Sequence, residues 1–87
     1  MVLFRWGGGA LLDLEKLDFI IAKRILGKMG WFEENFDDII PEKLKGVPDT
    51  YKFRVGDYRI IYTFESEVVF ILQVAHRRDV YKNLRSD

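Results

Sequence analysis

YKFRVGDYRIIYTFESEVVFILQVAHRRDVY, residues 51–81, shows the alternation of apolar and polar side chains that is typical of consecutive antiparallel strands. Gly56-Asp57 separates the first two strands, and glycine readily adopts the positive φ that a two-residue hairpin turn requires. This turn predicts that Arg54 pairs with Arg59. The stretch is therefore expected to form a three-stranded meander whose register follows from its turns.

The second turn of the meander is predicted to be a three-residue loop, residues 65–67. It pairs apolar residues across the strands: Phe64 with Val68, Tyr62 with Phe70, Ile60 with Leu72, and Tyr58 with Val74. A shift of one residue would turn every side chain to the other face, so a register of apolar pairs is preferred to its neighbours. We therefore expect Ile60, Phe70 and Leu72 in a core that is covered by helices.

The opposite face of the meander is predicted to be cationic. Because side chains alternate along a strand, this face carries Lys52, Arg54, Arg59, Gln73 and Arg77. Two arginines directly across a strand pair repel each other, and a fold tolerates them most easily where an anion binds. This face is therefore the predicted phosphate site.

The N-terminal half of the chain predicts a strand followed by helices. Residues 2–6 favour a short strand, and the three glycines at 7–9 favour a linker turn. Apolar residues recur every three or four positions over residues 10–29, the pattern of an amphipathic helix. Asp18 is a candidate N-cap within this segment, which therefore predicts two antiparallel helices broken near Asp18.

The remaining segments complete a single α+β domain over residues 1–87. Trp31 and Phe32 are candidates for the core, and the acidic run at 33–38 is expected to be a solvated loop. A basic turn, KLKG at 43–46, leads into the sheet, and a short C-terminal helix is expected from about Asp79 to Arg85. The predicted fold is a short N-terminal strand and a helical hairpin packed on an antiparallel β-meander.

Composition narrows the possible functions. The chain of 87 residues has no cysteine, which excludes disulfides and thiolate chemistry and suits the cytoplasm. The longest apolar run, residues 68–72, is too short to cross a bilayer, and the N-terminus lacks the pattern of a secretion signal. Net charge is zero, but residues 43–87 hold nine Lys and Arg against six Asp and Glu. The positive excess thus lies with the predicted site.

Three motifs taken together, RVGDYRIIY, VVFILQVA and HRRDVY, resemble the RelE/ParE toxin superfamily. The resemblance is closer to the RelE branch, and it extends to ALLDLEKLDFIIAKRILGKM and KLKG, hence to nearly the whole chain. It implies a ribosome-dependent messenger-RNA endonuclease that needs no metal or cofactor. It also implies a cognate RelB-like antitoxin as partner, with the ribosome and messenger RNA as targets and no membrane.

The resemblance also implies roles for the residues that match its motifs. Arg59 and Arg77 would stabilise the extra negative charge that develops on the phosphate during cleavage, since arginine meets phosphate oxygens two at a time. Tyr81 would stack on the substrate base and assist at the ribose 2′-OH. The alternative for Tyr81 is a packing contact between the tail and the sheet.

Lys52 and Arg54 match the two-lysine strand of the RelE branch only in part. A lysine crowded by arginines is a candidate for proton transfer near neutral pH, whereas arginine does not release its proton. His76, the only histidine, is a candidate substitute. Further RNA contacts are expected from Lys43, Lys45, Gln73, His76, Arg78 and Lys82.

Two other functions remain open. One is a ParE-like toxin that inhibits DNA gyrase, and the other is a non-catalytic RelE-fold module that only binds a partner. Zero net charge and Arg54 in place of a lysine favour the second. A metal site is not expected, because one histidine, no cysteine and no clustered carboxylates on the cationic face leave nothing to hold an ion.

Overall fold

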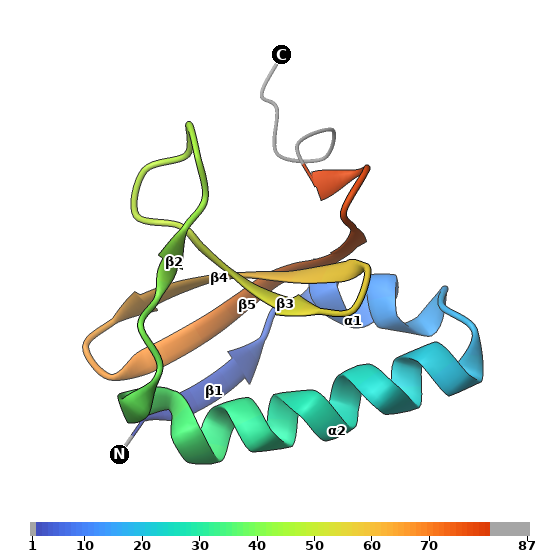
Figure 1. The fold of residues 1–87 in the computed structure, drawn as a ribbon, viewed down its shortest axis with the longest axis horizontal. Coiled ribbons are helices and arrows are strands. Elements are labelled where there is room, and N and C mark those ends of the chain that lie inside the picture. The colour runs from blue at the N-terminus through green and yellow to red at the C-terminus, as the bar shows by residue number, and fades with distance from the viewer. Residues whose placement is uncertain (1, 81–87) are drawn as a thin grey trace.

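The computed structural model describes residues 2–80. Its elements follow the order β1 (Leu3–Trp6), α1 (Gly8–Glu15), α2 (Phe19–Asn35), the 3-10 helix η1 (Phe36–Asp38), β2 (Glu42–Lys43), β3 (Tyr51–Val55), β4 (Tyr58–Glu65) and β5 (Val68–His76). The sheet has the order β1-β5-β4-β3-β2, with β1 parallel to β5 and the other pairs antiparallel. Both helices cover one side of this sheet (Figure 1), which confirms the α+β fold class.

The glycine run is not a linker. Helix α1 begins at Gly8, so Gly8 and Gly9 form its first turn, and the predicted flexible turn is wrong. The Gly7 amide donates to the Ile71 carbonyl oxygen at 2.9 Å and continues the pairing of β1 with β5. A Cβ at Gly7 would lie 2.9 Å from the Phe70 ring and 3.0 Å from the Ile71 oxygen. A larger residue at position 7 would therefore have to displace the Phe70 ring and would crowd the Ile71 carbonyl oxygen.

The helical hairpin is confirmed. The Asp18 carboxylate accepts a hydrogen bond from the Ile20 amide at 3.3 Å and caps α2. Helix α2 does not end at Met29 but continues to Asn35, so part of the acidic run predicted as a loop is helical. The extension places Phe32 in the core with no exposed surface, and this burial offsets the low helix propensity of Gly30.

The core between the helices and the sheet is centred on Phe32. Its ring stacks on Phe53, with centroids 3.9 Å apart, and makes edge contacts with Phe4, Phe36 and Tyr62 at 5.4 Å. These five aromatic residues come from α2, η1, β1, β3 and β4. One side chain of α2 therefore joins most elements of the fold.

The first hairpin has the predicted register. Arg54 pairs with Arg59 and Phe53 with Ile60, and Gly56 adopts the positive φ of 58° that the turn requires. Ile60 is buried under the helices, as predicted.

The second hairpin differs from the prediction by one residue. Its turn has two residues, Ser66 and Glu67, with φ values of 50° and 63°, and Glu65 pairs with Val68. Non-glycine residues rarely adopt this conformation, so the sequence favoured the longer loop. Val69 and Ile71 are consequently the buried residues, while Phe70 is 39% exposed and was wrongly assigned to the core.

A β-bulge in the middle of β5 shifts the pairing of β5 with β4 by one residue. Tyr62 pairs with Ile71 and Ile61 with Gln73, so Leu72 is the extra residue. Leu72 packs against a second apolar cluster on the face opposite the helices, so its predicted place beneath the helices is also wrong. Beyond the bulge the predicted pairs are wrong by two residues, since Ile60 pairs with Val74 and Tyr58 with His76. The predicted face of Val74 is nevertheless confirmed, because Val74 is buried in the core beneath the helices.

Helix α1 provides a hydrogen-bond partner for the part of β5 that extends beyond its pairing with β1. The Asp13 carboxylate accepts a hydrogen bond from the Val74 amide at 3.0 Å, in the place of a neighbouring strand. We expect Asp13→Ala to lower the free energy of unfolding by about 1–3 kcal/mol, because the amide loses its partner. Chemical denaturation measures the difference. Asp13→Asn keeps an acceptor and loses less, and exposed Glu15→Ala stays within about 0.5 kcal/mol. Equal losses of unfolding free energy for Asp13→Ala and Glu15→Ala would contradict the role of Asp13 as hydrogen-bond partner of β5.

Tyr62 makes stability sensitive to alkaline pH. Burial, with a smaller contribution from Tyr51, raises the pKa of Tyr62 from 10.0 to about 12. The folded state thus favours the protonated phenol, and this stabilisation is complete below pH 10 and lost as pH rises from about 10 to about 12. We expect a decline of about 2–3 kcal/mol over that interval. Denaturant titrations of the parent and Tyr62→Phe measure it, and an equal decline in the variant would exclude Tyr62 as the cause.

Candidate nucleic-acid interface

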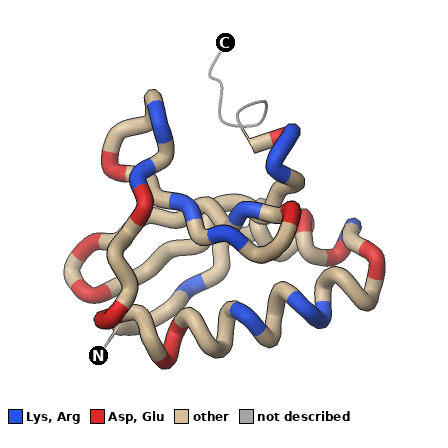
Figure 2. The backbone as a smooth tube through the Cα atoms, viewed as in Figure 1, with Lys and Arg blue, Asp and Glu red and all other residues tan. Residues whose placement is uncertain are grey.

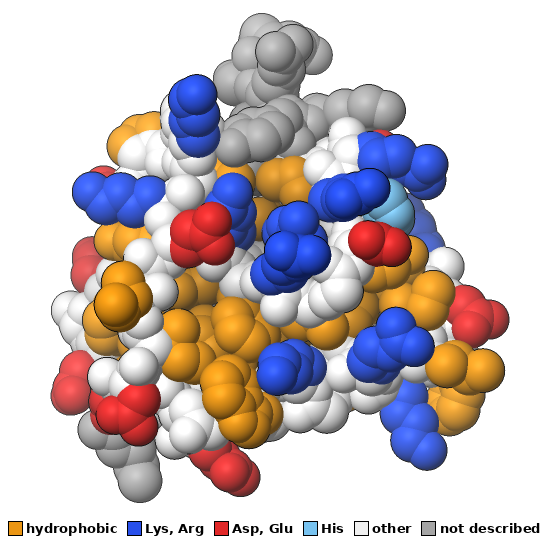
Figure 3. Space-filling view, in the orientation of Figure 1, with side chains coloured by type: hydrophobic (Ala, Val, Ile, Leu, Met, Phe, Trp, Pro, Cys, Tyr) orange, Lys and Arg blue, Asp and Glu red, His pale blue; other side chains and the backbone are white. Residues whose placement is uncertain are grey.

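The predicted cationic face is present on the side of the sheet that the helices leave open. Strand pairing gives one row of Lys52, Ile61 and Gln73 and a second row of Arg54, Arg59 and Ala75. Figure 2 shows basic positions across this part of the sheet, between the loop after β2 and the turn after β5. Lys and Arg side chains gather over the same region in the space-filling view of Figure 3.

Arg54 and Arg59 are held next to each other by one carbonyl group. Arg54 Nε donates to the Gly56 oxygen at 3.4 Å, and Arg59 Nη1 donates to the same oxygen at 3.1 Å and to the Tyr58 oxygen at 3.1 Å. Neither guanidinium has a carboxylate partner within residues 2–80. Nε and Nη2 of Arg59 remain available to an anion, since arginine carries five N–H donors.

Lys52 has a partner that the sequence did not reveal. Its Nζ lies 3.6 Å from Oε2 of Glu42, which pairs with Lys52 across β2 and β3. The strand that supplies Glu42 is only two residues long, too short for a periodic pattern to predict. The positive charge of Lys52 is thus partly balanced, unlike that of the two arginines.

Arg77 follows β5 at the turn of the first hairpin. Its amide donates to the Asp57 carbonyl oxygen at 2.7 Å, which places Arg77 next to the Gly56-Asp57 turn. Arg77 lies in the turn just beyond the end of β5 and is exposed. The backbone therefore brings Arg77 to the same end of the face as the arginine pair.

Other predicted contacts occupy different positions. His76 pairs with Tyr58, their rings 5.4 Å apart, so it lies on the helix side of the sheet and not on the cationic face. Lys43 pairs with Tyr51 and is likewise out of phase with Lys52, at the sheet edge. Lys45 and Arg78 are exposed in the flanking loop and turn. Tyr81 and Lys82, with the predicted C-terminal helix beyond Val80, lie outside the described residues.

An apolar cluster divides the cationic face. Leu44 and Val80 bury Ile61 and Ala75 between the two flanking segments, with Leu72 packed alongside. Gln73 is only 5% exposed, and both polar atoms of its amide are buried without a hydrogen-bond partner. An unsatisfied buried amide costs stability. The apolar Leu44 inside KLKG was the available signal that this turn packs on the sheet.

Within residues 2–80, His, Asp and Glu side chains nowhere gather in groups of three or more that could hold a metal ion. In the same part of the chain, no helix has the length and apolar character that crossing a bilayer requires.

Solved toxin–antitoxin structures resemble this fold. The RelBE2 complex from Mycobacterium tuberculosis contains a chain 25% identical to this one, with TM-score 0.74, over 87% of this chain and 98% of that chain. The RelB–RelE complex from Methanococcus jannaschii gives 27% identity and TM-score 0.67, over 97% and 100%. The ParDE system of P. aeruginosa, at 11% identity and TM-score 0.75 over 87% and 96%, shares the fold. Comparison with curated proteins gives no match.

A family model gives the same result from sequence. The model described as the ParE toxin of the type II toxin–antitoxin system parDE matches residues 4–81, most of the chain. The matched span contains both helices, the cationic face and all of the sheet except the first residue of β1. The chain therefore belongs to the ParE toxin family and is a toxin of a type II toxin–antitoxin system within the RelE/ParE superfamily.

Proposed function

We propose that this toxin is a messenger-RNA endonuclease of the RelE type, active on the ribosome and neutralised by a RelB-like antitoxin. The proposal is carried by the unneutralised Arg54–Arg59 pair, which converges on the Gly56 oxygen. Lys52 is in phase with this pair on the open face of the sheet. Arg77 follows β5 next to the turn that holds the pair. A site of this charge suits a phosphodiester, because arginine binds phosphate oxygens in a planar fork.

Cleavage would proceed by attack of a ribose 2′-OH on the adjacent phosphate. The products are a 2′,3′-cyclic phosphate and a 5′-hydroxyl end, so a proton leaves the 2′-OH and another reaches the departing 5′-oxygen. Arg59 and Arg77 stabilise the negative charge that builds on the phosphorane between these steps. Lys52 is the proton carrier among the described residues of the face, and Glu42 orients it. His76 is left out because it faces the helices.

RNA contacts outside the reacting phosphate come from the residues that flank this face. Tyr81 stacks on the base next to the cleaved bond, and base stacking on an aromatic ring contributes roughly 1–3 kcal/mol. Gln73, which the sequence assigned to RNA binding, is left out, because both polar atoms of its amide are buried. Lys43, Lys45, Arg78 and Lys82 contribute positive charge along the strand of RNA.

A gyrase-inhibiting function is the second candidate. The match to the ParE family favours it, and so does Arg54, which cannot transfer a proton. In that case the cationic face docks on a protein and carries out no chemistry. The same residues would serve a non-catalytic module.

One pair of assays separates these functions. The purified toxin is added to a translation reaction, and messenger RNA is mapped for new 5′-hydroxyl ends, while DNA gyrase is assayed in parallel for supercoiling. We expect new ends within translated frames, suppression by antitoxin, and unchanged supercoiling. Inhibited gyrase with intact messenger RNA would establish the ParE activity instead. If messenger RNA stays intact and gyrase stays active, the toxin acts only as a binding module, and the proposal is overturned.

A further inference from the structure

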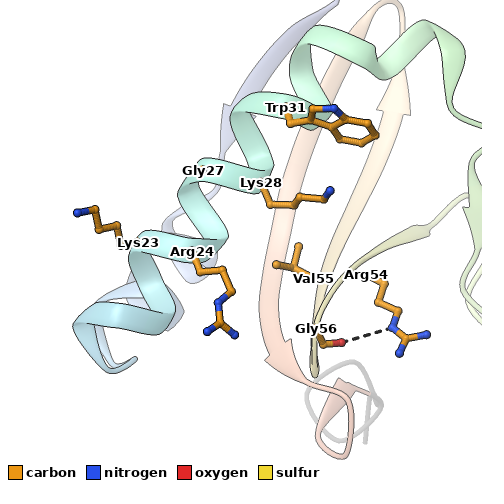
Figure 4. A pocket seen from close by; sticks show the side chains of 8 residues that line it. All are labelled: Lys23, Arg24, Gly27, Lys28, Trp31, Arg54, Val55 and Gly56. Carbon is orange, nitrogen blue, oxygen red and sulfur yellow. Dashed lines mark hydrogen bonds between the residues drawn. The ribbon is translucent and has the colours of Figure 1, made fainter.

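A groove between α2 and the β3–β4 turn lies next to the candidate face. It has a volume of about 480 Å³ and is lined by Lys23, Arg24, Gly27, Lys28, Trp31, Arg54, Val55 and Gly56. Figure 4 shows Arg24 and Lys28 reaching from α2 toward the strand side, where Arg54 lies, while Lys23 extends away. Arg24 and Lys28 are distant in the chain from Arg54, so the sequence alone does not show that these residues meet.

The charge around this groove has one sign. Four of its lining residues are basic and none is acidic. None of the four forms an ion pair with a carboxylate of the described chain. Lys28 Nζ lies 4.3 Å from the centroid of the Trp31 ring, and Arg54 Nε donates to the Gly56 oxygen. Both side chains are therefore held at the groove without losing their charge.

The acidic residues of α2 follow the segment that lines the groove, residues 23–31. Glu33 and Glu34 occupy the last turn, where the helix dipole disfavours negative charge, and no basic residue is present in that turn. This separation of charge does not serve the stability of the helix. Within the segment of α2 that lines the groove, residues 23–31, every charged residue is basic.

We propose that this groove binds the sugar–phosphate backbone of RNA and extends the candidate face along the strand. The inference rests on the proposed function, since Arg54 lines the groove and shares the Gly56 oxygen with Arg59. A single strand bound at the arginine pair would thus continue past Arg54 toward Arg24 and Lys28. An acidic protein segment is the competing occupant, but continuity with the arginine pair favours RNA.

The test compares two double variants with equal loss of charge. Arg24→Gln with Lys28→Gln removes the groove cations, while Arg5→Gln with Lys16→Gln removes exposed cations elsewhere. Binding of labelled oligouridylate is measured by fluorescence anisotropy over a range of salt concentrations, with thermal melts to verify the fold. We expect the groove pair to bind about tenfold more weakly, with the salt slope reduced by roughly 1.4, because each phosphate contact on a single strand contributes about 0.7. The control pair should change affinity less than threefold.

Each outcome decides the inference. Equal losses in both pairs, or no binding of oligouridylate by the parent toxin, would overturn it. Loss of antitoxin binding with unchanged RNA binding would make the groove a protein interface and also overturn it. A selective loss of RNA binding in a toxin that cleaves no messenger would support the groove and reject the endonuclease. Cleavage by the parent with unchanged RNA binding by the groove pair would reject the groove alone.

Discussion

Phe32→Ala is expected to lower the free energy of unfolding by about 3–5 kcal/mol. Phe32 has no exposed surface and contacts aromatic rings from four other elements, so no single element can move in to fill the space. The loss approaches the whole stability of a small domain, typically 5–15 kcal/mol. Denaturant unfolding followed by circular dichroism measures it.

Phe19→Ala is the matched control for this substitution. Phe19 belongs to the same helix and has the same side chain, but it is 76% exposed. We expect a change within about 0.5 kcal/mol, as for surface substitutions in general. Comparable losses at the two positions would show that the aromatic cluster does not hold the helix to the sheet.

Arg59→Ala is expected to reduce cleavage of ribosome-bound messenger RNA by about 10²–10³-fold, the range found when one transition-state donor is removed from other enzymes. Arg77→Ala should have a similar effect. Each guanidinium stabilises charge that exists only in the transition state, so the rate should fall more than the affinity. Single-turnover cleavage at saturating toxin measures the rate, and antitoxin binding verifies the fold of each variant.

Arg78→Ala provides the control for both arginines. Arg78 is exposed and out of phase with Arg77, and its amide donates to His76 Nδ1 at 3.2 Å. We expect a loss of less than about tenfold, because it supplies only general electrostatic attraction. Equal losses of cleavage rate for Arg77→Ala and Arg78→Ala would show that general positive charge, and not a defined phosphate site, accounts for the effect. Tyr81→Ala should lie between the two if its role is stacking.

Local sequence signals were sufficient for the first hairpin and the helical hairpin. Gly56 fixed one turn, and Asp18 marked the start of α2, because each satisfies a backbone requirement that few residues meet. The Arg54–Arg59 pair followed from the first of these. That part of the candidate face was therefore predictable from a few neighbouring residues.

The second hairpin could not be predicted from such signals. Ser66 and Glu67 adopt positive φ without glycine, and the bulge at Leu72 carries no local mark. Both are imposed by tertiary packing, which buries Val69 and Ile71 beneath the helices. Glu42 as the partner of Lys52, and the groove beneath α2, likewise depend on which segments meet in space.

The bulge at Leu72 has a consequence for how this sequence can vary. It takes up one residue of difference between the two halves of β5, so the half that begins at Gln73 can keep its phase when the preceding turn is one residue longer. A one-residue insertion at Ser66-Glu67 combined with deletion of Leu72 would shift the first half of the strand and leave Ala75 opposite Arg59. The tip of the hairpin can thus gain one residue while the arginines stay in register.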